Sequence, residues 1–436
     1  MWTRIHSIDS LPKMIKVRVD YYRKSDHGKL TEALKKAPNR KIPPSGGDAI
    51  EIPTAEFLAY WLFEDKNPDD PLVRDFEALA ALASEAIPDL RNNFESNDST
   101  IRARIRKTGQ ERPPDIPTRL GVAIGLSVVN QIVGLTRADW SKIDKCRSNK
   151  RENPRFDYEL AATPVGLVAL ENKGGIVRDN TKKGPAVSKR KREIEECKTS
   201  LRPSYEEVPL IGTIGVADSR DDSQLKCWLL DPPMPNPSNL PPEVFRVLNR
   251  LRFQRSLVQM ILPMSHAVHN AMREREMDIL REQSIGSFEG KSLRYPSGGR
   301  INLKWKAERK VHAIGKNGLW VGMVTKLKHD RILFAGLGKR WVDAALRQEL
   351  RFVSEFDGIS ASGDSKLEWH ATGDELAMLS GFEFTRGEVE NDLTTVSLPV
   401  SLHETMGGFA FAIIEKKEIP PGKSFEFGID RIEKPK

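Results

Sequence analysis

The sequence predicts a mixed α/β protein of several domains, with a central mixed sheet flanked by helices. Three observations support this fold class. Residues 156–230 alternate strand-like and helix-like segments, as expected for a sheet with a helical connection. Residues 287–436 carry short alternating runs between turn signals, which predicts a β-rich C-terminal domain. The chain has 436 residues, of which 39% are hydrophobic, enough for two or three domains.

Residues 1–112 form the first expected unit, an N-terminal α/β region. Clean alternation predicts a half-buried strand at 15–21, and helical spacing predicts helices at 29–40, 54–64 and 72–86. No catalytic motif lies in this region. It ends in a polar, basic stretch around Ile101–Lys107. This stretch is either a strand or mobile arm that approaches nucleic acid and binds phosphates, or a basic linker. We place the domain boundary there.

The most informative stretch is Phe156–Gly174, FDYELAATPVGLVALENKG. Two strand-like runs flank a Pro-Val-Gly turn, which predicts a β-hairpin. Because side chains alternate along a strand, Asp157 and Glu159 share one face, and Glu171 and Lys173 share one face of the next strand. Several carboxylates and one ammonium would then meet at one place.

Clustered carboxylates repel unless something compensates for their charge. A Mg²⁺ ion does so with one or two protein carboxylates, waters and phosphate oxygens, and a neighbouring Lys can stabilise developing negative charge. The alternative is an exposed hairpin whose charges are solvated or weakly paired across the strands. The residues alone leave both interpretations open.

Asp157 followed by Glu171-Asn172-Lys173 resembles the signature of the PD-(D/E)XK (restriction-endonuclease-like) nuclease superfamily. That family's core is a helix, a hairpin-bearing sheet, a second helix and a further strand. The same order is readable here in a helical stretch at 117–135, the hairpin, a helix at 185–198 and strands at 208–216 and 226–230. The resemblance covers about 113–232, and we expect the corresponding unit to span 113–237.

The resemblance implies an endonuclease that hydrolyses phosphodiester bonds with Mg²⁺ or Mn²⁺. Asp157, Glu171 and Lys173 would be catalytic. The metal would be held by Asp157 and Glu171, with Glu159 as an auxiliary ligand and the carbonyl of Asn172 completing the shell. Two features differ from the family pattern: Asn172 stands where an apolar residue is frequent, and the first helix lacks an acidic residue, with Arg119 and Asn130 among its few polar positions.

The densest run of positive charge follows the hairpin directly. Such cations supply much of the sequence-independent affinity for nucleic acid, although a charge run is also typical of a solvated helix face. We predict that this run contacts phosphates. Its members are Lys182, Lys183, Lys189, Arg190, Lys191 and Arg192.

Residues 238–286 are expected to form a helical segment after a proline-rich spacer, and 287–436 the β-rich domain, an assembly or recognition module. Expected strands include 301–306, 319–326, 331–335 and 424–432. Trp305, Trp320, Trp341 and Trp369 could stack on bases, but large aromatic residues in β domains are more often part of the core. His266 and His269 have helical spacing but no third metal ligand nearby.

Composition favours a soluble cytoplasmic protein with a polyanionic partner. The net charge is +8, and the three Cys residues (Cys146, Cys197 and Cys227) are too widely spaced for a metal or disulfide framework. No run reaches the length of a membrane span, and the N-terminus lacks a signal-peptide core.

The leading hypothesis is therefore a metal-dependent nuclease that cleaves DNA, rather than RNA, in restriction or phage defence, acting as a homodimer or with a partner defence protein. The alternative is a nuclease-fold protein without catalytic activity that binds nucleic acid or takes part in assembly. A third interpretation treats the hairpin as incidental and the chain as a scaffold.

Overall fold

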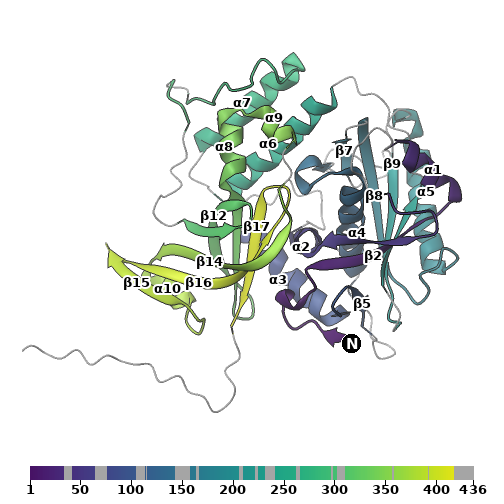
Figure 1. The fold of residues 1–436 in the computed structure, drawn as a ribbon, viewed down its shortest axis with the longest axis horizontal. Coiled ribbons are helices and arrows are strands. Elements are labelled where there is room, and N and C mark those ends of the chain that lie inside the picture. The colour runs from purple at the N-terminus through teal and green to yellow at the C-terminus, as the bar shows by residue number, and fades with distance from the viewer. Residues whose placement is uncertain are drawn as a thin grey trace, which may run out of the picture.

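A computed structural model describes residues 1–33, 42–63, 76–104, 113, 115–142, 158–163, 166–205, 210–220, 224–230, 241–261, 266–295, 298–301, 310–355, 358–390 and 392–416. These residues form helices and sheets, which confirms the mixed α/β class. Figure 1 shows one large sheet on one side and a barrel with further helices on the other. The expected strands at 301–306 and 424–432 fall wholly or largely outside the described residues.

Within the described residues, seven strands form a mixed sheet in the order β3-β2-β10-β9-β8-β7-β6. Neighbouring strands are antiparallel except for two parallel pairs, β2 with β10 and β8 with β9. Their bounds are β2 Met14–Tyr21, β3 Asp48–Pro53, β6 Ser141–Lys142, β7 Tyr158–Thr163, β8 Gly166–Ile176, β9 Leu210–Ala217 and β10 Leu225–Leu230. A small second sheet joins β1 (Thr3–Arg4), β4 (Phe94–Ser96) and β5 (Ile101–Ala103).

The large sheet has a helix on each face. Helix α4 (Asp115–Val133) is apolar around most of its circumference and is buried along most of its length, as a core helix must be. Helix α5 (Pro185–Tyr205) connects β8 to the parallel strand β9 and packs on the other face through Val187 and Ile194. Helix α1 (Lys24–Ala33) follows β2.

The C-terminal β-rich region contains a closed barrel, an arrangement that the sequence did not predict. Among the described residues, six strands run in the order β14-β11-β12-β13-β17-β16, and β16 pairs back with β14. The bounds are β11 Val311–Gly315, β12 Gly318–Leu327, β13 Arg331–Gly338, β14 Ala361–Ala371, β16 Leu393–Glu404 and β17 Phe409–Glu415. Strand β15 (Thr385–Glu390) extends the sheet beside β16.

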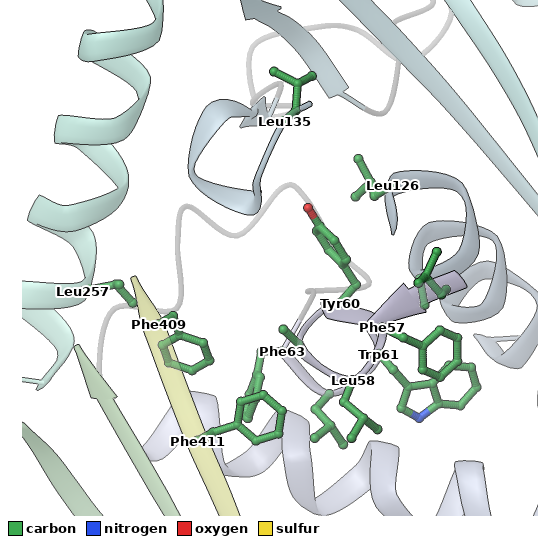
Figure 2. Close-up of a cluster of buried hydrophobic side chains, with 14 of the residues drawn as sticks. Phe57, Leu58, Tyr60, Trp61, Phe63, Leu126, Leu135, Leu257, Phe409 and Phe411 are labelled. Carbon is green, nitrogen blue, oxygen red and sulfur yellow. The ribbon is translucent and has the colours of Figure 1, made fainter. Parts of the chain in front are cut away.

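Helices fill the space between the large sheet and the barrel. All ten residues of α2 (Thr54–Phe63) are buried, and α3 (Phe76–Asn93) lies beside it. In Figure 2, Phe63 of α2 points towards Phe409 and Phe411 of β17, with ring centroids 5.3 and 5.0 Å away. The remaining helices are α6 (Pro242–Ile261), α7 (His266–Glu282), α8 (Lys339–Arg347), α9 (Leu350–Glu355) and α10 (Gly373–Met378), with short 3₁₀ turns η1 (Ile8–Ser10) and η2 (Arg137–Asp139).

The sequence-based units share one apolar core, although the barrel also encloses a second cluster of its own, all of whose buried members lie within 311–412. Strands β2 and β3, from 1–112, belong to the same sheet as the strands of 113–237. One hydrophobic cluster includes Phe57, Leu126, Leu257 and Phe409, one from each of the four expected units, and all four are labelled in Figure 2. Described residues of all four expected units therefore contribute to one shared apolar cluster.

Candidate active site on strand β8

The expected hairpin is formed by β7 and β8, which pair antiparallel, with Thr163 opposite Gly166. Strand β8 places the side chains of Glu171 and Asn172 on opposite faces of the sheet. Asn172 faces α4, because a Cβ on Gly125 of that helix would lie 2.1 Å from Asn172 Oδ1. The same oxygen accepts a hydrogen bond of 2.7 Å from Thr213 Oγ1 of β9.

Helix α4 fixes the backbone of this part of β8 by very close packing. A Cβ on Gly121 would lie 2.6 Å from the carbonyl carbon of Lys173, and one on Gly174 would lie 1.7 Å from the carbonyl oxygen of Pro117. Glycine is therefore required at both positions for the helix to approach the strand. The Glu171-Asn172-Lys173 segment is held by the core on one face while its other face presents charge.

Glu171 and Lys173 meet on the face opposite α4. Lys173 Nζ lies 2.5 Å from Glu171 Oε1, a short charge-assisted contact. The carboxylate is buried, with 4% of its side chain exposed, whereas 25% of the Lys173 side chain is exposed. A buried carboxylate with a partly exposed ammonium beside it is suited to binding a cation or an anionic group at the protein surface.

Helix α5 covers the neighbouring part of the same face. Glu171 pairs in register with Gly212 of β9, and a Cβ at Gly212 would lie 2.8 Å from Ile194 of α5. Ile194 and Val187 are buried against the sheet, whereas Lys191 lies near Tyr22 on the flank towards β2. Helical spacing puts Arg190 and Glu193 on the opposite flank, towards β7.

The other expected ligands are placed only in part. Asp157 lies outside the described residues, immediately before β7, and Glu159 is described by its backbone alone, paired with Ser141 of β6. The Asn172 side chain lies on the α4 face, so only its backbone carbonyl could serve the expected metal. Within the described residues, no group of three His, Cys, Asp or Glu residues is close enough to hold a metal ion.

One described side chain, the Glu171 carboxylate, is suited to binding a hard divalent cation. Glu171 provides a buried anionic oxygen, and Mg²⁺ takes one or two protein carboxylates and completes its shell with water and phosphate oxygens. Lys173 lies where it can neutralise a further negative group. His266 and His269 supply no such site, since His269 Nε2 lies 2.9 Å from Arg255 Nη1.

The six expected phosphate-binding cations fall into two groups. Lys182, Lys183 and Lys189 are exposed and form no ion pair with a described residue. The other three pair with glutamates along α5: Arg190 with Glu193 (2.8 Å), Lys191 with Glu195 (2.5 Å) and Arg192 with Glu196 (3.6 Å). The net positive charge available to a ligand is therefore concentrated at the N-terminal end of α5.

The polar residues of α4 hold the core together and do not reach the Glu171 face. Arg119 Nη1 donates to the carbonyl oxygen of Trp61 at 3.0 Å. Asn130 donates to Tyr60 Oη at 2.8 Å and accepts from Trp140 Nε1 at 2.8 Å. In the barrel region, the side chains of Trp320, Trp341 and Trp369 are buried, so they are not available to stack on bases, and Trp305 lies outside the described residues.

Sequence reasoning missed a buried charge cluster around Asp139, which follows α4 and precedes β6. Asp139 is fully buried and is contacted by Arg246 at 3.1 Å and Arg250 at 2.7 Å, both from α6. It also caps η2 by accepting from the backbone N–H of Thr136. The Thr-x-x-Asp spacing of a capping box was the available signal.

Comparisons of the chain with protein-family models, with curated proteins and with solved structures found no match. Contrary to the expectation that no run is long enough for a membrane span, helix α4 is, within the described residues, one helix that is long and apolar enough to cross a membrane. Most of that apolar window (78%) is buried inside the fold, which is consistent with a soluble protein.

Proposed function

We propose that this protein is a metal-dependent nuclease that hydrolyses phosphodiester bonds of DNA, with its active site at Glu171 and Lys173. The observation that carries the proposal is the 2.5 Å contact between a buried carboxylate and a partly exposed ammonium on one face of one strand. Burying this carboxylate costs free energy, which its ammonium neighbour and a bound cation would both offset. A site that must bind a cation and a phosphate gains from this arrangement.

The order of elements supports the proposal. Helix α4 precedes the antiparallel strands β6, β7 and β8, and α5 then crosses to β9, which is parallel to β8. This is the order that the resemblance to the PD-(D/E)XK nucleases implies. We assign the restriction-endonuclease-like core to these elements, with β10, β2 and β3 as an extension of the sheet and the barrel as a recognition or assembly module packed against it.

In the proposed site, Asp157 and Glu171 would hold Mg²⁺ or Mn²⁺, with Glu159 and the backbone carbonyl of Asn172 as further oxygen donors. When bound, the ion would supply Lewis-acid stabilisation and an activated water. Lys173 would donate to the scissile phosphate or orient the attacking water. Its partly exposed side chain has access to both. Tight packing of α4 on Gly174 would keep the Lys173 backbone in place.

The charge on α5 supports a duplex backbone as substrate. Lys182, Lys183 and Lys189 follow β8 and lie outside the ion pairs of α5. Phosphate contacts of this kind do not depend on sequence and position the duplex. We assign the cytoplasm as the location and restriction or phage defence as the setting, with a homodimer or a defence protein as the partner.

The test is cleavage of supercoiled plasmid in the presence of Mg²⁺ or Mn²⁺ by the parent protein and by the variants Glu171→Gln and Lys173→Ala. Each variant should lose activity by about a hundredfold or more, as expected when a group that stabilises transition-state charge is removed. Lys366→Ala is the matched control, because Lys366 is exposed on β14 of the barrel. Equal cleavage by all four proteins would exclude this site.

One observation favours a second candidate, a nuclease-fold protein that binds nucleic acid without cutting it. Glu171 and Lys173 already neutralise each other at 2.5 Å, and the described residues contain no group of three His, Cys, Asp or Glu that could hold a metal ion. This function predicts salt-sensitive DNA binding that needs no metal and ends in no cleavage. The plasmid assay separates the two candidates, because only the nuclease yields nicked or linear product.

A further inference from the structure

A groove of about 510 Å³ lies between α7 and a wall formed by residues 290–294 and Arg300, in the part of the molecule that contains the barrel. Its charged lining comprises Glu274, Arg275 and Asp278 of α7, and Lys291, Arg294 and Arg300 of the opposite wall. A volume of this size accommodates a small organic ligand. The groove is separate from the Glu171 site and has no part in the proposed nuclease.

Two arginines stand directly opposite each other on the loop wall. Arg294 and Arg300 form an isolated antiparallel bridge. The flanking hydrogen bonds, Tyr295 N to Gly299 O at 2.8 Å and Ile301 N to Leu293 O at 3.0 Å, make it a non-hydrogen-bonded pair, in which side chains approach most closely. Like charges at such positions are destabilising. An anion between the two guanidinium groups would remove that cost.

The carboxylates of the groove do not compensate for these cations. Within the described residues, Lys291, Arg294 and Arg300 form no ion pair, and neither does Glu274, although all four line one groove. Asp278 pairs with Arg281, at 3.3 Å. Four cations and two carboxylates leave the groove with a net charge of 4 − 2 = +2. Of the four cations, Lys291, Arg294 and Arg300 remain available to a ligand.

The rest of the fold holds this wall in place. Leu293 and Ile301 are buried, and Leu293 N donates to the carbonyl oxygen of Leu346 at 2.8 Å. Arg275 Nη1 crosses the groove to the carbonyl oxygen of Lys291 at 3.1 Å and to Gln348 Oε1 at 2.9 Å. The two walls are thereby tied together, and binding would require little reorganisation of the backbone.

The two walls differ in chemistry, which restricts the class of ligand. The loop wall carries three cations and the hydroxyl of Ser292, whereas the α7 wall carries Arg275 together with the acceptors Glu274 and Asp278, of which Asp278 also pairs with Arg281. We propose that the groove binds a mononucleotide, with its phosphate between Arg294 and Arg300 and its ribose hydroxyls or base amine donating to Glu274 and Asp278. A polynucleotide backbone fits less well, because the two carboxylates would repel a continuous row of phosphates.

The test is calorimetric titration of the full-length protein with adenosine 5′-monophosphate, inorganic phosphate, adenosine and a short DNA duplex. The nucleotide should bind with one-to-one stoichiometry and more tightly than inorganic phosphate or adenosine, and duplex binding, which the proposed nuclease site provides, should not depend on Arg294 or Arg300. Arg294→Ala and Arg300→Ala should each weaken nucleotide binding by about tenfold or more, the usual effect of losing a charged hydrogen bond. Arg273→Ala should leave it unchanged, because this exposed arginine of α7 does not line the groove.

A separate variant tests the carboxylates of α7 that line the groove. Glu274→Gln should weaken binding of adenosine 5′-monophosphate but leave binding of inorganic phosphate unchanged or stronger. Absence of nucleotide binding, or nucleotide binding that survives both arginine substitutions, would overturn the proposal. Inorganic phosphate that binds as tightly as the nucleotide would reduce the groove to a simple oxyanion site, and duplex binding that is lost in both arginine variants would identify a nucleic-acid backbone as the ligand of the groove. Either result overturns the mononucleotide assignment.

Discussion

Arg250 and Asp139 form an ion pair in which both side chains are fully buried. Arg250 Nε lies 2.7 Å from Oδ1 of Asp139 and Nη2 lies 3.0 Å from Oδ2, so the contact is bidentate. Arg250 Nη1 also donates to the carbonyl oxygen of Val353 in α9, at 2.9 Å. The pair thereby connects the segment that enters β6 to α6 and to the helices beside the barrel.

Breaking this pair should strongly destabilise the protein. Arg250→Ala leaves a buried carboxylate without its bidentate partner, and we expect a loss of about 3–5 kcal/mol in the free energy of unfolding, measured in urea. Arg252→Ala is the control on the same helix. Arg252 is 45% exposed and lies 3.7 Å from Glu276, so its loss should cost about 1 kcal/mol or less. Equal losses of unfolding free energy in the two variants would contradict the structural role assigned to the buried Arg250–Asp139 pair.

The same pair predicts a dependence of stability on pH. Burial alone would raise the pKa of Asp139, but Arg250, Arg246 and the Thr136 backbone N–H outweigh it and hold the pKa below its ordinary value. A carboxyl group with a lowered folded-state pKa contributes stability above its unfolded pKa of about 3.9, and that stability is lost as the pH falls through the folded value. The difference in unfolding free energy between the parent and Asp139→Asn should be constant near neutral pH and shrink below about pH 4. A difference that instead grew as the pH fell would contradict this sign.

The close approach of α4 to β8 predicts an unequal response at two adjacent glycines. Gly174→Ala would bring a Cβ to 1.7 Å from the Pro117 carbonyl oxygen, so the helix must shift, and we expect a loss of about 1–3 kcal/mol or more in unfolding free energy. Gly175→Ala meets its nearest atom at 3.4 Å, an ordinary contact, and should be nearly neutral. Urea denaturation of the two variants measures their unfolding free energies. Similar losses in both would contradict the close packing of α4 on Gly174.

Charge pairing along α5 predicts which cations bind DNA. The triple substitution of Lys182, Lys183 and Lys189 by Ala should weaken binding of a labelled duplex and reduce the slope of log K against log salt by about 0.9 for each phosphate that the protein no longer neutralises. Fluorescence anisotropy at several salt concentrations measures both effects. Arg192→Ala is the control, since Arg192 is 70% exposed and opposes Glu196. A larger loss of duplex affinity in Arg192→Ala than in the triple variant would contradict the assignment of the three lysines as the phosphate-binding cations.

Much of the sheet around the candidate site could be predicted because its signals are local. Alternation predicted β2 and the two hairpin strands, and turn residues predicted the reversal between them. Period-two geometry also placed Glu171 and Lys173 on one face, where the structure brings them to 2.5 Å. A helix at 185–198 followed from helical spacing, and α5 spans Pro185–Tyr205.

The features that sequence reasoning did not predict depend on contacts between distant residues. Nothing local in Lys226 or Cys227 indicates that β10 pairs in parallel with β2, about two hundred positions earlier. Closure of the barrel needs Leu367 of β14 opposite Leu398 of β16, a pairing that alternation alone does not specify. The buried Asp139 network was missed for the same reason, because its arginines lie on α6, more than a hundred positions away.

The single-turnover cleavage rate of Glu171→Gln on a labelled DNA duplex, measured in Mg²⁺ alongside its duplex affinity, tests the nuclease assignment most directly. The substitution keeps the shape of the side chain and removes its charge. We predict that the rate falls by about a hundredfold or more, while affinity measured without metal changes by less than about threefold. Cleavage by Glu171→Gln at the parent rate would contradict the assignment of this strand as the active site.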